Sequence, residues 1–176
     1  MLKRISNRLP ALNQITPVYA VIIFMSAAWM ILAFVWKLPA WLYFQTVYEI
    51  LPILAYAFMQ IFFDSLLYLG LLLLICVILP ARFFKDEFSV RGTWAAIGLI
   101  GTYIAFVNLL FVLGGSFQAW TLSAVLIGVG LAALSARVGW LASFALQISD
   151  RLIIFLYILL PVSAISILTV IIRNLN

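Results

Sequence analysis

Asp64 is the residue of this sequence whose type and position most require a chemical explanation. It lies in an apolar run over residues 53–79, in which Gln60 and Asp64 are the main polar interruptions. A carboxylate placed in the hydrocarbon of a bilayer costs at least about 2.5 kcal/mol on insertion scales. We therefore expect Asp64 to be protonated, paired with another group or hydrated.

Polar residues in other apolar runs fall at a similar depth. We count from the end of each run that is predicted to face the cytoplasm. Asp64 lies 15 residues from that end, and Asn108, Thr121 and Ser166 each lie 14 residues from the corresponding end of their own run. At a rise of 1.5 Å per residue, all four lie roughly 21 Å from one membrane boundary. Gln60 and Tyr68 lie one turn to either side of Asp64. The predicted intramembrane polar layer consists of Asp64, Asn108, Gln60, Tyr68, Thr121 and Ser166.

Two interpretations of Asp64 follow from this layer. In the first, Asp64 is hydrogen-bonded to Asn108 and nearby hydroxyls and joins the helices together. In the second, Asp64 binds a proton or a cation, or contacts a substrate in a cavity that opens to the outside. Residue types alone favour neither interpretation decisively.

Other kinds of chemistry are poorly supported by the sequence. Histidine is absent, which excludes His-ligated haem, histidine metal sites and an imidazole base. Cys76 is the only cysteine and lies in an apolar run, so it is expected to be a small buried hydrophobe. We predict no cofactor, no metal and no catalytic residue. The other acidic residues and Lys37 are not spaced as the residues of a catalytic site would be. These residues are Lys37, Glu49, Asp86, Glu87 and Asp150.

Composition identifies the elements that must position these residues. The chain has 176 residues, of which 68% are hydrophobic and only 9% are charged, far outside the range of soluble domains. Each membrane-spanning helix uses roughly 20 residues, so about five spans occupy the chain. We predict an all-α, polytopic membrane helix bundle that forms a single membrane domain over 1–176. The predicted spans are 18–36, 53–79, 94–113, 118–135 and 152–172.

The distribution of basic residues predicts the orientation of these spans. Alternate segments on one side carry eight of the ten Lys and Arg residues, and those on the other side carry two. By the positive-inside rule the N-terminus is cytoplasmic and the C-terminus is outside, with the first apolar run retained as a span. We expect a prokaryotic plasma membrane, with anionic headgroups against the cytoplasmic face. The net charge is +5, but the basic residues are scattered along the chain rather than gathered on one polar face, which argues against nucleic acid as a partner.

Two connecting segments have an interfacial character. Residues 37–49 are rich in Trp and Tyr and are predicted to lie along the outer membrane surface. Residues 138–147 place apolar side chains at helical spacing and are predicted to form a separate short interfacial helix. Ser149 and Asp150 would then supply the N-cap of the last span.

Small residues predict which helices pack closely. Lipid gives helices little hydrophobic reason to associate, so positions that allow close backbone approach mark interfaces. The short, uncharged connection after the third span predicts an antiparallel hairpin with the fourth, although the same faces could instead support a dimer. The small residues are Gly98, Gly101 and Ala105 in the third span, and Ala124, Gly128 and Ala132 in the fourth.

Three functions are compatible with these features. The preferred one is a non-catalytic subunit or accessory protein of a membrane complex, with a membrane-protein partner or a second copy of the chain. The alternative is a small transporter or channel that uses Asp64. In helix number and orientation the chain also resembles the five-helix membrane anchor of sulfatase-like phosphoglycerol and phosphoethanolamine transferases. That resemblance implies a role as a membrane anchor and is one of topology, with no matched motif.

Overall fold

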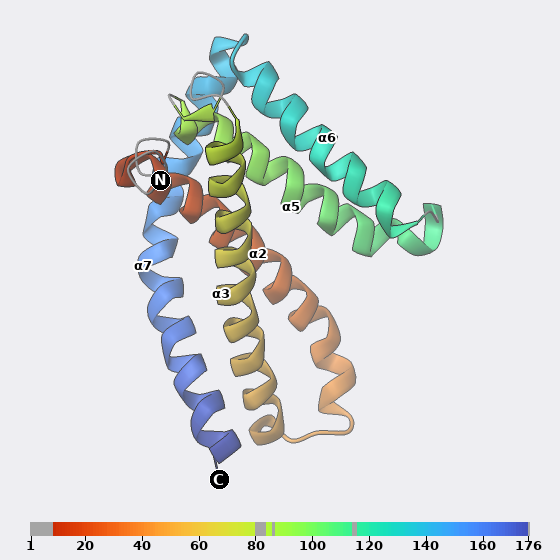
Figure 1. Ribbon diagram of the computed structural model, residues 1–176. Coiled ribbons are helices and arrows are strands. Elements are labelled where there is room, and N and C mark those ends of the chain that lie inside the picture. Colours follow the sequence, from red (N-terminus) through yellow and green to blue (C-terminus); the bar gives the residue numbers. More distant parts are fainter. Residues whose placement is uncertain (1–8, 80–83, 86, 114–115, 176) are drawn as a thin grey trace.

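The computed structural model describes residues 9–79, 84–85, 87–113 and 116–175, and the regular structure in these ranges is entirely helical (Figure 1). Five of its helices are long and apolar enough to cross a membrane, which confirms the predicted all-helical class and the number of spans. They are α2 (Leu12–Leu42), α3 (Val47–Ile78), α5 (Phe88–Leu113), α6 (Phe117–Ser135) and α7 (Gly139–Leu175).

The five helices alternate in direction (Figure 1). One end of the bundle holds the end of α3, the start of α5, the end of α6 and the start of α7, and we call it the basic end because Arg91 and Arg137 lie there. The opposite end, here the far end, holds the turn between α2 and α3 and the C-terminal residues of α7. The first and last described residues therefore lie at opposite ends of the molecule.

The segment over residues 37–49 is mostly helical. Helix α2 continues to Leu42 and α3 begins at Val47, so only residues 43–46 form a turn. The Glu49 carboxylate accepts hydrogen bonds from the Thr46 backbone N–H at 2.7 Å and from its hydroxyl at 3.0 Å. This carboxylate satisfies an N–H group that the first turn of α3 would otherwise leave unpaired.

The predicted separate helix over residues 138–147 is wrong, because α7 is one continuous helix from Gly139 to Leu175. Ser149 is not an N-cap: its hydroxyl donates to the Leu146 carbonyl inside the helix, at 3.1 Å. The physical reason is a single buried stripe with helical spacing that continues through this region and gives the helix no place to break. The stripe comprises Leu141, Ala145, Ser149, Leu159, Ser163, Ser166 and Val170.

The core lies toward the basic end, and α2 passes through it. Val18 and Ile22 are fully buried in a cluster with residues of α3 and α5, including Leu72 and Phe88. A second cluster joins α2 and α3 to α7 through Ile23, Ala27, Ile61 and Leu159. The second half of α2 is largely exposed, so the helices are packed most tightly near the basic end.

Helices α5 and α6 form an antiparallel hairpin that diverges from the other three helices (Figure 1). They approach most closely where Gly98 meets Gly128, and both residues are buried. A β-carbon added to Gly98 would lie 2.6 Å from the Gly128 Cα, a distance that real β-carbons do not adopt. Ala124 and Ala132 are buried on the same stripe of α6. Ala105 is half-buried, and Gly101 lies off the contact, because a β-carbon there would meet nothing within 4 Å.

The two glycines of α5 offer a matched test of this contact. Gly98→Ala is expected to destabilise the protein by about 1–3 kcal/mol, because the added methyl group forces the two backbones apart. Gly101→Ala is expected to be neutral or stabilising, since alanine favours the helix and meets open space there. Unfolding by titration of a denaturing detergent into mild-detergent micelles measures both. Equal effects of the two variants would contradict the described packing.

Candidate intramembrane polar site

Asp64 lies near the middle of α3 and borders a cavity of about 110 Å³ between α2, α3 and α5. Its carboxylate accepts a hydrogen bond from the Gln60 side-chain amide at 2.8 Å, one turn earlier in the same helix. The lining comprises Ser26, Trp29 and Met30 from α2, Ile61, Asp64 and Tyr68 from α3, and Ile100, Tyr103 and Ile104 from α5. Asp64 is the only charged residue of that lining.

The cavity carries polar groups from each of its three helices. Ser26 contributes a hydroxyl whose oxygen is buried and has no hydrogen-bond partner among the described residues. Tyr68 and Tyr103 add two phenols. A buried hydroxyl without a partner costs free energy, so a small hydrogen-bonding occupant between Ser26 and Asp64 would be favourable.

A second cavity of about 160 Å³ adjoins the first, since Tyr68 and Tyr103 line both. It lies between α3, α5 and α6, and we call it the aromatic cavity because five of its eleven lining residues are aromatic. Phe106 packs against Phe117 and Trp120, with ring centroids 5.9 and 5.5 Å apart. Tyr68 and Tyr103 therefore border both the chamber beside Asp64 and the aromatic cavity.

The hydrogen bond expected between Asp64 and Asn108 is not formed among the described residues. Asn108 donates its side-chain amide to the Ile104 carbonyl of its own helix, at 2.7 Å. It borders a different cavity, of about 510 Å³, formed mainly by the exposed half of α2. The side chain of Asn108 thus satisfies its own helix rather than the neighbouring carboxylate.

The other two residues of the predicted layer also lie apart from Asp64. The Thr121 hydroxyl donates to the Phe117 carbonyl, and Thr121 borders the aromatic cavity. Ser166 is buried on α7, one turn from Ser163, and lines neither of the two chambers. The structure therefore gathers Gln60, Asp64 and Tyr68 but places Asn108, Thr121 and Ser166 elsewhere.

Several polar residues of this region were missed by sequence reasoning. Tyr19 of α2 and Ser65 of α3 are joined by a hydrogen bond of 3.2 Å between their hydroxyl oxygens, which links the two helices. Ser26 and Tyr103 complete the chamber. Each is a single polar residue in an apolar span, which is a usable signal, but only the register between helices shows which of them meet.

The polar groups gathered around Asp64 can form hydrogen bonds with a ligand. No cluster of three or more His, Cys, Asp or Glu side chains that could hold a metal ion occurs in the part of the chain that the structure describes. One carboxylate, one amide and several hydroxyls can hydrogen-bond to a helix, to water or to a small cation.

Comparison with known proteins adds no family to this picture. No known protein family matches the chain. No curated protein and no solved structure matches it significantly.

Double-mutant cycles test the pairing of Asp64. Gln60→Ala and Asp64→Ala are expected to couple by about 1 kcal/mol in the free energy of unfolding, because they share a hydrogen bond. Asp64→Ala and Asn108→Ala are expected to add within about 0.3 kcal/mol, because each residue has its own partner. Detergent-titration unfolding of the single and double variants measures both couplings. A larger coupling for Asn108 than for Gln60 would overturn this arrangement.

Proposed function

We propose that this chain is a non-catalytic subunit of a membrane complex and that α3 binds a helix of its partner through the face that carries Gln60. The proposal includes the predicted orientation, with the basic end on the cytoplasmic side of a plasma membrane. Five apolar helices make the chain compatible with an integral membrane protein, and the position of Gln60 supports the more specific role.

The observation that carries the proposal is the exposure of Gln60 in the middle of a span. The residues on its side of α3 form an exposed stripe at helical spacing, which we call the α3 stripe. Gln60 is its only amide, and the Gln60 side chain is exposed. Helix α7 contacts the stripe at Tyr56, whose hydroxyl donates to the Asn174 side chain at 3.2 Å. The α3 stripe comprises Tyr56, Gln60, Phe63, Leu67, Leu71, Leu74 and Ile78.

The hydrogen bond between Gln60 and Asp64 uses only some of the donors and acceptors of these two side chains. Within the described residues it uses one N–H of the Gln60 amide, and the second N–H and the carbonyl oxygen have no partner. The Asp64 carboxylate likewise retains capacity to accept further hydrogen bonds. Lipid tails offer neither donors nor acceptors, so each unmet group costs free energy in the hydrocarbon. A covering helix removes that cost.

These groups also define the partner's chemistry. A helix that covers Gln60 must offer both a donor and an acceptor at that depth, which Ser, Thr, Asn or Gln provides. The rest of the α3 stripe is aliphatic or aromatic and needs only close packing. The partner is therefore expected to be an apolar helix with one such polar residue, on another protein or on a second copy of this chain.

The test compares two positions of the α3 stripe. Gln60→Leu is expected to weaken the complex about tenfold, and Leu67→Ile, a swap of similar volume one step along the stripe, is expected to leave it intact. Native mass spectrometry of the protein extracted from its own membranes in mild detergent measures the fraction in complex. A wild-type chain that is monomeric in several mild detergents, or a complex that tolerates Gln60→Leu, would contradict the proposal.

A second function is favoured by a different observation, the chamber beside Asp64. The chamber has a volume of about 110 Å³ and is lined by the Asp64 carboxylate and by the Ser26 hydroxyl, which has no partner among the described residues. It therefore has room and ligands for a proton carrier such as water, or for a small cation. In this alternative Asp64 acts within a small transporter or channel.

Flux measurements separate the two functions. If the chamber conducts, proteoliposomes with the wild-type chain should show proton or monovalent-cation flux that Asp64→Asn reduces at least tenfold, since the variant cannot carry the charge. Gln60→Leu, which leaves the carboxylate in place, should retain most of that flux. Flux that does not differ from that of empty liposomes would eliminate the alternative.

A further inference from the structure

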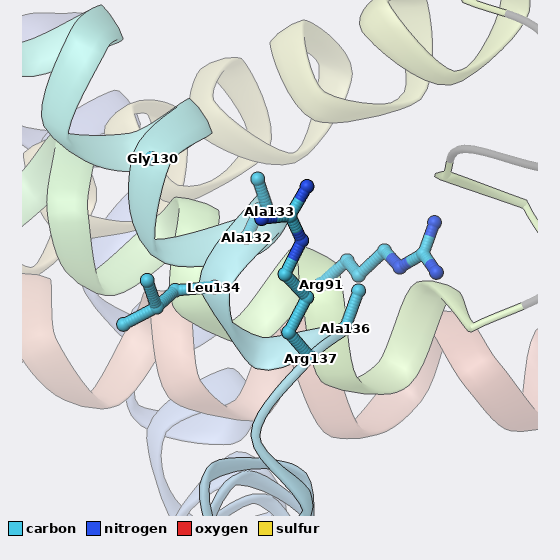
Figure 2. A pocket seen from close by; sticks show the side chains of 7 residues that line it. All are labelled: Arg91, Gly130, Ala132, Ala133, Leu134, Ala136 and Arg137. Carbon is cyan, nitrogen blue, oxygen red and sulfur yellow. The ribbon is translucent and has the colours of Figure 1, made fainter.

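A cavity at the basic end is lined by two arginines and a floor of small residues (Figure 2). It has a volume of about 420 Å³ and lies between the start of α5 and the end of α6. Its lining is Arg91, Gly130, Ala132, Ala133, Leu134, Ala136 and Arg137. In Figure 2 the Arg137 side chain runs upward beside Ala133, whereas the Arg91 side chain extends to the right, so their guanidinium groups lie at separate points.

The described lining of this cavity contains two arginines and no acidic residue. Arg91 forms an ion pair with Glu87 of the same helix at 2.9 Å, and its side chain is only 13% exposed. Arg137 has no carboxylate partner within ion-pairing distance among the described residues. Arg91, Glu87 and Arg137 together carry a net charge of +1, which matches the single negative charge of a phosphodiester.

The cavity lies at the level of the lipid headgroups. Helix α6 has 19 residues and is about 28 Å long, close to the hydrocarbon thickness of about 30 Å. Arg137 comes two residues after its end and therefore reaches the phosphate region. Gly130 and Leu134 continue the lining along α6 toward the hydrocarbon, so an occupant can be polar at one end and apolar at the other.

We propose that this cavity binds the phosphate of an anionic phospholipid between Arg91 and Arg137, with an acyl chain lying along the small-residue face of α6. Arg137 supplies a charge that no carboxylate among the described residues balances, and Arg91 is ion-paired with Glu87. Basic cavities between membrane helices recognise anionic headgroups in this way. The site is independent of the α3 stripe.

Lipid titration of the purified protein in mild detergent tests the proposal. Phosphatidylglycerol is expected to bind and to raise the melting temperature, whereas phosphatidylcholine and inorganic phosphate at equal concentration should not. Arg137→Gln should weaken phosphatidylglycerol binding about fivefold, the contribution expected of one arginine at a membrane surface. Arg151→Gln, which removes an exposed arginine of α7 that does not line the cavity, is the matched control and should leave binding unchanged.

A second variant is expected to strengthen phosphatidylglycerol binding, which a folding defect would not do. Glu87→Gln removes the carboxylate that competes with phosphate for Arg91 and should tighten phosphatidylglycerol binding. Stabilisation by inorganic phosphate equal to that by phosphatidylglycerol would overturn the assignment to lipid. Equal losses of phosphatidylglycerol binding in Arg137→Gln and Arg151→Gln would show that binding depends only on general surface charge, and they would overturn the proposed site.

Discussion

The contact between the backbones of α5 and α6 at Gly98 and Gly128 is the constraint on which the arrangement of this protein depends. In lipid, helices gain little by hiding apolar surface from one another, so the hairpin is held by close van der Waals approach. Helix α6 packs mainly on α5, and α5 packs on α2. The position of α6, and with it the cavity beside Arg137, is thus set by two residues that have no side chain.

The helices pack tightly near the basic end and more loosely toward the far end. Val18, Ile22 and Phe88 fix the helices where their basic ends meet, and the hairpin then diverges from the other helices (Figure 1). The chamber beside Asp64 and the aromatic cavity beside Tyr103 occupy the region of that divergence. The polar groups that line these two cavities therefore lie where helix packing is incomplete, and they are available there to another helix, to water or to an ion.

The sequence predicted features that depend on one helix or on neighbouring helices. Helix number follows from hydropathy, and the meeting of Gly98 with Gly128 follows from small-residue spacing and a short connection. The polar layer was predicted from depth alone, and depth does not specify rotation about the helix axis. Asn108, for example, bonds to its own helix. The rotations of α2 and α5, which bring Ser26 and Tyr103 to Asp64, depend on packing among three helices that spacing in one helix cannot encode.

The continuity of α7 has a consequence for the surrounding bilayer. Its 37 residues measure about 55 Å, nearly twice the length of α6, although both belong to one packed unit. A hydrocarbon layer of about 30 Å matches α6 when that helix stands upright and is exceeded by α7 unless α7 tilts or extends into water. Trp140, Asp150 and Arg151 are exposed in the first part of α7, which favours the extension of that part into water. Helix α6 would then cross the hydrocarbon over its whole length, whereas the first turns of α7 would stand outside it.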